Sequence, residues 1–95
     1  MVTIRIHLDS APADNAPLLV APGSHRLGKI PEAELGEAVA RCGSAECLAE
    51  AGDIWIYATP IVHASAAAQA QGRRRVLQVD YSAETLPHPL EWLGI

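Results

Sequence analysis

Residues 60–81 read "PIVHASAAAQAQGRRRVLQVDY", and this stretch contains the pattern that decides the fold. Two apolar segments, 61–65 and 74–82, are separated by small and polar residues that end at Gly72. Short apolar segments bounded by turn residues are typical of β-strands. We therefore expect two strands here, joined by a loop over residues 66–72.

Short strands and turns also account for most of the remaining chain. Residues 2–8 alternate between apolar and polar side chains, and 17–21 and two pieces of 47–60 are rich in β-forming residues. "PGSHRLG" at 22–28 predicts a turn, because proline followed by glycine suits a type II turn. The sequence thus predicts about six strands.

One segment, "PEAELGEAVARC" at residues 31–42, predicts a helix. Pro31 fits its first turn, and a buried stripe is expected from Leu35, Ala38 and Val39. One helix inserted among about six short strands indicates an antiparallel β-sandwich or small barrel.

The C-terminal segment, residues 83–95, is expected to be a tail because it contains two prolines and little periodicity. Its apolar side chains, Leu90, Trp92 and Leu93, are expected to pack against another surface. With 95 residues, the chain is expected to be a single domain over 1–95.

Composition excludes several classes of protein. A hydrophobic content of 49% excludes simple disorder, and a net charge of −4 argues against general nucleic-acid binding. The apolar runs are shorter than the roughly 20 residues of a membrane span, and the N-terminus has no signal-peptide core, which predicts a cytoplasmic protein without membrane contact. Cys42 and Cys47 are expected to be reduced thiols, since no second cysteine pair completes a zinc site.

Residues 60–81 contain two candidate functional features, a lone histidine and a run of three arginines. His63 ends one expected strand, although a lone histidine is most often structural or exposed. A run of three arginines opens the next strand, and such a run is usually a solvated edge. Alternation nevertheless separates Arg74 from Arg73 and Arg75, so that Arg74 faces inward if the Leu77 face of the strand packs outward. An inward arginine needs an anionic partner, for which a carboxylate is suited.

The order of four motifs resembles the second half of the phytanoyl-CoA dioxygenase family. These motifs are "NAPLLVAPGSHRLG" (15–28), the "GD" and "HAS" of "AGDIWIYATPIVHAS" (51–65), and "GRRRVLQVDYS" (72–82), with the glycine–arginine pair about ten residues after the histidine. The resemblance spans nearly the whole chain. It implies a double-stranded β-helix of the jelly-roll or cupin-like type, here an incomplete barrel with one inserted helix.

The family's chemistry implies a role for several residues. The resemblance implies an Fe(II)- and 2-oxoglutarate-dependent dioxygenase acting on a small-molecule substrate. His63 matches the distal histidine of the iron site, Arg74 matches the arginine that binds the far carboxylate of 2-oxoglutarate, and Ser65 matches a serine that assists it. The turn at Pro22–His25 is expected to be scaffold.

The chain departs from the family at the other two iron ligands. These form an H-x-D motif upstream of the strand that residues 2–8 match, so the chain is expected to be the C-terminal portion of a longer oxygenase. His7 and Asp9 also read as H-x-D and are additional candidate ligands, but in the alignment they fall at a strand end, where a surface histidine is the alternative. Arg5 stands where the family often has an aromatic residue. An exposed sheet is expected to promote self-association.

Three functions remain open from the sequence. The first is an oxygenase module, the second a non-catalytic cupin-like domain that binds an organic acid, and the third an oligomerising β domain. The substrate is not readable from these residues.

Overall fold

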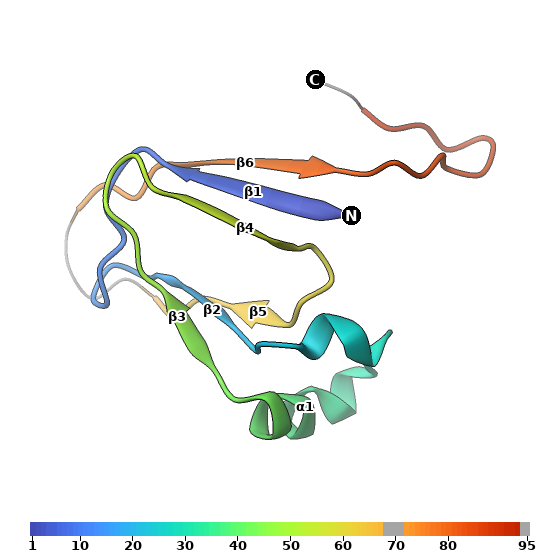
Figure 1. Ribbon diagram of the computed structural model, residues 1–95, viewed down its shortest axis with the longest axis horizontal. Coiled ribbons are helices and arrows are strands. Elements are labelled where there is room, and N and C mark those ends of the chain that lie inside the picture. Colours follow the sequence, from blue (N-terminus) through green and yellow to red (C-terminus); the bar gives the residue numbers. More distant parts are fainter. Residues whose placement is uncertain (68–71, 94–95) are drawn as a thin grey trace.

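The computed structural model describes residues 1–67 and 72–93, and its chain forms two small antiparallel sheets with one short helix. Figure 1 shows the two sheets as layers, with the helical segments beside the second sheet. The elements are β1 (Val2–His7), β2 (Leu18–Val20), η1 (Ser24–Leu27), η2 (Glu32–Glu34), α1 (Leu35–Cys42), β3 (Ala45–Cys47), β4 (Ile54–Ala58), β5 (His63–Ala64) and β6 (Val76–Tyr81).

The strands pair in two groups of three. The first sheet has the order β4-β1-β6 and the second has the order β3-β2-β5, with every pairing antiparallel. An additional bridge joins Ala11 to Ala49 between the two sheets' connecting segments. The mainly β fold expected from the sequence is therefore confirmed, and the arrangement is open rather than a closed barrel.

The first sheet turns its polar face inward. Thr3 and His7 are only 1% and 2% exposed, and Tyr57 on the same face lies next to His63 of the second sheet, with ring centroids 6.3 Å apart. The register places these residues on the inner face: Thr3, Arg5, His7, Trp55, Tyr57, Val76, Gln78 and Asp80.

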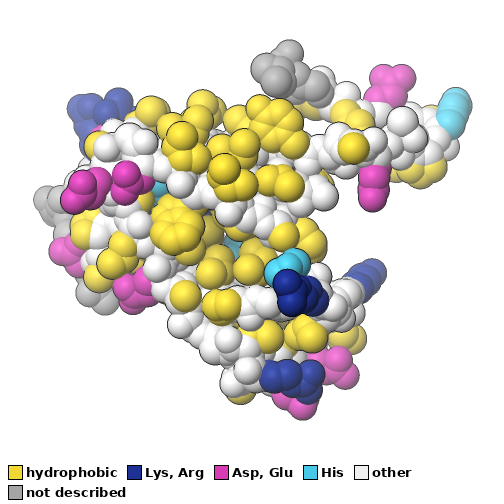
Figure 2. Space-filling model, viewed as in Figure 1, with side chains coloured by type: hydrophobic (Ala, Val, Ile, Leu, Met, Phe, Trp, Pro, Cys, Tyr) yellow, Lys and Arg dark blue, Asp and Glu magenta, His cyan; other side chains and the backbone are white. Residues whose placement is uncertain are grey.

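The opposite face of this sheet is apolar and open to solvent. It consists of Val2, Ile4, Ile6, Ile54, Ile56, Ala58, Leu77, Val79 and Tyr81. Ile56 is 64% exposed and Leu77 is 52% exposed. Figure 2 shows hydrophobic side chains gathered over the β4-β1-β6 sheet. We call these nine residues the outer apolar face.

The turn and the helix follow the sequence closely. Gly23 has φ 83° and ψ −9°, and the Ser24 amide donates to the Ala21 carbonyl at 3.1 Å, as a type II turn requires. The expected helix over 31–42 begins later than predicted, because Glu32–Glu34 form a 3₁₀ turn and α1 starts at Leu35. Ala38 is buried, and its neighbours in the predicted stripe, Leu35 and Val39, are half-buried.

Two expectations differ from the structure. The tail was expected to pack through its large apolar side chains, but these are exposed, with Leu90 at 60%, Trp92 at 49% and Leu93 at 101%. The tail extends beyond β6, away from the second sheet (Figure 1). The strand expected over 61–65 is shorter, because only His63 and Ala64 pair with β2. Part of the expected loop at 66–72 lies outside the described residues. Among the helices that are described, none has the length and apolar content to cross a membrane.

Candidate functional site

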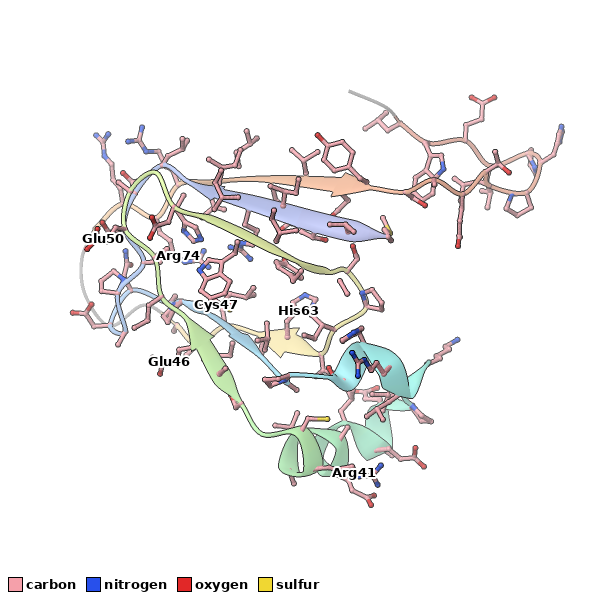
Figure 3. The ribbon with its side chains drawn as sticks, viewed as in Figure 1. Arg41, Glu46, Cys47, Glu50, His63 and Arg74 are labelled. Atoms are coloured by element: carbon pink, nitrogen blue, oxygen red, sulfur yellow. The ribbon has the colours of Figure 1, made fainter. Side chains whose placement is uncertain are left out.

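His63 lies in the space between the two sheets with one ring nitrogen already engaged (Figure 3). Its Nδ1 is 2.8 Å from the carbonyl oxygen of Ile61. A carbonyl only accepts, so Nδ1 must carry the proton and Nε2 has a free lone pair. Metal-binding histidines commonly have this arrangement, in which the far nitrogen donates to a carbonyl and fixes the ring. His63 is therefore suited to ligate a metal through Nε2.

The turn at Ser24 holds the segment that carries His63. The Ser24 hydroxyl accepts the Val62 amide at 2.8 Å, and the Ala21 amide donates to the Val62 carbonyl at 2.9 Å. Ser24 is 1% exposed, so the bond to its hydroxyl is shielded from water. The expectation that this turn is scaffold thus has a physical basis, although the particular bond was not foreseen from the sequence.

Replacing Ser24 with alanine is expected to lower the free energy of unfolding by about 1–3 kcal/mol, since the Val62 amide would lose its partner in a buried setting. Urea denaturation measures the change. Ser44→Ala is the matched control, because Ser44 is exposed. Equal losses in the two variants would argue against a specific role for the Ser24 hydroxyl.

Arg74 points inward from the segment before β6. Arg74 is half-buried while Arg73 and Arg75 are exposed, and its Nε donates to the Ala16 carbonyl at 2.7 Å. Ala16 has φ 49°, which is unusual for a residue with a Cβ atom. Figure 3 shows Arg74 between the sheets, as it does His63. Both side chains thus lie on the sides of the two sheets that face each other, with Arg74 half-buried in the segment before β6 and His63 exposed on β5.

Two residues of the β1–β2 connection fix the arginine run. Asn15 Nδ2 donates to the Arg73 carbonyl at 3.2 Å. Asp9 Oδ2 accepts the Arg75 amide at 2.8 Å and the Arg75 Nε at 2.9 Å. These hydrogen bonds lower the pKa of Asp9 to about 2 and raise that of Arg75. The ion pair with Asp9 thus holds the exposed Arg75 side chain at the surface, while Arg74 beside it is half-buried.

His7 and Asp9 do not join His63 in a metal site. β1 ends at His7, so the alternation that would place Asp9 on the same face stops there, and the Asp9 carboxylate is taken by Arg75. Within residues 1–67 and 72–93, no three histidine, cysteine, aspartate or glutamate side chains form a group able to hold a metal ion. The additional ligand pair suggested by "HLD" is therefore not assembled with His63.

Ser65 lies just beyond β5 and is exposed. No hydrogen bond of its hydroxyl occurs in the part of the chain that the structure describes. Ser65 is thus not hydrogen-bonded to Arg74 among the described residues, and its expected assisting role stays a prediction.

A cleft of about 650 Å³ adjoins His63. Its walls come from the segments around η1, α1 and β5, and are formed by His25, Gly28, Lys29, Ile30, Leu35, Pro60, Ile61, Val62 and His63. The mixture of apolar walls with a few polar groups is typical of small-molecule sites. Sequence reasoning missed this cleft, because it depends on how the 22–35 segment packs beside β5.

Comparison with known proteins places this geometry in a family. The model of the family described as phytanoyl-CoA dioxygenase (PhyH) matches residues 1–76. Among solved structures, EctD from S. alaskensis with bound Fe matches with a TM-score of 0.70 and 25% identity over 81% of this chain. EctD with 2-oxoglutarate and 5-hydroxyectoine matches equally well, as does EvdMO1. A comparison with curated protein sequences found no match.

The chain is much shorter than these relatives. It spans 30% of the EctD chain with bound Fe and 19% of the EvdMO1 chain. The match is nevertheless continuous over most of its own residues, and the open pair of sheets corresponds to part of a cupin-type fold. The chain belongs to the phytanoyl-CoA dioxygenase family, a family of Fe(II)- and 2-oxoglutarate-dependent oxygenases.

Proposed function

We propose that this chain is the part of a 2-oxoglutarate-dependent dioxygenase that binds the far carboxylate of 2-oxoglutarate through Arg74 and supplies one iron ligand, His63. The observation that supports this most strongly is the inward orientation of both side chains between the sheets. Arg74 uses only its Nε, for the Ala16 carbonyl, and has no carboxylate at ion-pair distance among the described residues. Its two terminal nitrogens remain for a ligand, and this planar fork matches a carboxylate.

His63 is suited to bind iron, but the described residues do not provide a complete set of iron ligands. The free Nε2 of His63 suits a metal, but one protein ligand does not hold iron tightly, and no group of three is present in the described residues. Bound iron would supply the oxygen chemistry, while this chain's residues orient the 2-oxoglutarate. The remaining ligands must come from residues other than those described.

We propose that the cleft beside His63 receives the small-molecule substrate. The EctD structure holds 5-hydroxyectoine together with 2-oxoglutarate, so a ligand of modest size is compatible with this fold. In the present chain, Lys29 and His25 supply the basic groups among largely apolar walls. These groups favour a substrate with an apolar body and a negative or hydrogen-bond-accepting group.

A non-catalytic domain that binds an organic acid is the alternative function. It is favoured because the described residues contain no group of three metal ligands, while Arg74 could bind an organic acid without a metal. An oligomerising β domain without any small-molecule ligand is the third function.

Metal dependence separates these functions. We expect 2-oxoglutarate to raise the melting temperature in metal-free buffer, and anaerobic Fe(II) to increase that shift by chelation between the keto acid and His63. Succinate, which lacks the keto oxygen, should not respond to Fe(II). A response to 2-oxoglutarate that Fe(II) does not change would favour the organic-acid-binding domain, and no response to either acid would favour the oligomerising domain.

We also propose that two copies associate through the outer apolar face. This face contains nine apolar side chains and no charge, so a second copy covers it without burying an unpaired charge. The sequence suggested association through an exposed sheet, and the exposed side chains on the outer face of β4-β1-β6 support this proposal. The proposed location is the cytoplasm, which suits the free thiols of Cys42 and Cys47.

Replacing Ile56 with lysine is expected to convert associated chains into monomers, because Ile56 is 64% exposed on this face at the centre of β4. Light scattering with size-exclusion chromatography measures the mass. Leu93→Lys is the control, since Leu93 is fully exposed on the tail and lies off the sheet. A wild-type chain that is monomeric at high concentration would refute the proposed self-association.

A further inference from the structure

Arg5 occupies the inner face of β1 and is a basic residue that the proposed function does not use. It pairs in register with Trp55 on one side and Gln78 on the other, and neither residue carries a charge. Its Nε is buried and has no hydrogen-bond partner among residues 1–67 and 72–93, although the residue as a whole is half-buried. A buried donor without a partner costs free energy, which points to a missing acceptor.

His7, two residues along the same face, shows the same deficit. It is 2% exposed, and both its ring nitrogens are buried without a hydrogen-bond partner in the described part of the chain. Burial lowers its pKa, as do the positive charges of Arg5 and Arg74, while Asp53 acts in the opposite direction. Both arginines are therefore close enough to act on one histidine.

No acidic side chain among the described residues forms an ion pair with either inner arginine. Asp80 is the acidic residue on the inner face, and its carboxylate accepts a hydrogen bond from Thr3 at 2.6 Å. Among residues 1–67 and 72–93, no carboxylate forms an ion pair with Arg5 or Arg74, whereas Arg75 and Arg41 both have acidic partners at the surface. A chain with a net charge of −4 thus keeps two arginines between its sheets without an ion-pair partner among the described residues.

We propose that Arg5, with His7 beside it, is a second anion-binding group next to Arg74, and that the interior binds a small dicarboxylate through both of its carboxylates without a metal. One arginine binds each carboxylate, and the unbonded His7 ring is available to donate one further hydrogen bond. The binding of one carboxylate by Arg74 rests on the proposed function, whereas the binding of the other by Arg5 does not. The Arg5 half depends on its own unbonded nitrogen and on the lack of an ion-pair partner for Arg5 among the described residues.

Two separate arginines, Arg5 and Arg74, require a ligand with two carboxylates. A dicarboxylate such as succinate or 2-oxoglutarate satisfies both, whereas a monocarboxylate satisfies one. A keto group is not required, so succinate and 2-oxoglutarate should bind with similar affinity when a chelator removes metals.

The test is calorimetric titration of the 95-residue chain with succinate, 2-oxoglutarate and propionate in buffer containing a chelator. We expect both dicarboxylates to bind, and propionate to bind at least about tenfold more weakly because it engages one arginine. Arg5→Met should weaken succinate binding by about tenfold or more, and Arg26→Met, at an exposed arginine, should leave it unchanged. Equal affinity for succinate and propionate would overturn the proposal.

Melting temperatures measured without ligand show whether a loss of succinate binding in Arg5→Met comes from misfolding. Arg5→Met should melt at the same or a higher temperature than the wild type, because it removes a buried charge that has no partner. A variant that melts lower and also fails to bind would overturn the assignment of Arg5 to the ligand, since the residue would then serve the fold. If Arg74→Ala removes succinate binding while Arg5→Met does not, the inference fails and the proposed function stands. The converse result retains Arg5 and refutes the proposed role of Arg74.

Discussion

Replacing Arg74 with alanine is expected to weaken 2-oxoglutarate binding by roughly 30- to 1000-fold, equivalent to about 2–4 kcal/mol. The physical reason is the loss of a charge-assisted, two-point hydrogen bond in a partly buried setting, where water replaces it poorly. Arg74 is half-buried and its Nε is already held by the Ala16 carbonyl, so the guanidinium is oriented before the ligand arrives. Titration calorimetry in chelator-treated buffer measures the change.

Arg73 provides the matched control, because it is the preceding residue in the same run but is exposed. Only its backbone carbonyl is engaged, by Asn15, so Arg73→Ala removes a charge without disturbing that contact. Less than a threefold loss is expected for this variant, as for other exposed charges. Equal losses for Arg73→Ala and Arg74→Ala would show that the arginines act as a general positive charge, contrary to the inward orientation of one of them.

Replacing His63 with alanine is expected to abolish the increase in 2-oxoglutarate affinity that a divalent metal produces. The Nδ1 proton of His63 is donated to the Ile61 carbonyl, which leaves Nε2 as the ligand atom. Without that atom the chain retains no metal ligand at this position. Affinity for 2-oxoglutarate should therefore be the same with and without metal in the variant, as measured by anaerobic titration with Fe(II).

Two comparisons show whether this effect is specific. His88→Ala removes an exposed histidine from the tail and should leave the metal response intact. The affinity of His63→Ala for succinate in chelator-treated buffer should match that of the wild type, because the arginines are unchanged. Retention of the full metal response in His63→Ala would exclude His63 as a ligand.

Alternation in the sequence distinguished Arg74 from Arg73 and Arg75, but its inward orientation depended on which face of β6 is covered. β6 begins only at Val76, yet the extended pattern continues back through Arg74, because Asp9 and the Leu8 amide hold the Arg75 backbone. Alternation carries no information on Ser65, which lies after a strand of two residues where no ladder maintains it. It also stops before Asp9, since β1 has already ended at His7.

Which face of β1 is buried was not determined by the pattern alone. Alternating Val2, Ile4 and Ile6 would ordinarily be expected to form the core, but Thr3 and His7 on the other face are the buried residues. The second sheet covers the polar face, and its position depends on long-range pairing that a local pattern does not specify. Arg5 was noted as an unusual residue in the sequence, but its unbonded Nε became evident only when its neighbours in β4 and β6 were known.

The central claim is that His63 and Arg74 bind two parts of one ligand between the sheets, and side-chain NMR during a single titration tests it most directly. Adding 2-oxoglutarate to the labelled chain should shift the guanidinium signals of Arg74, while those of Arg73 stay in place. Subsequent addition of Zn(II), a diamagnetic substitute for Fe(II), should shift the His63 Nε2 signal and leave the His88 ring unchanged. Movement of Arg73 in place of Arg74, or a His63 signal indifferent to Zn(II) at saturating 2-oxoglutarate, would contradict the claim.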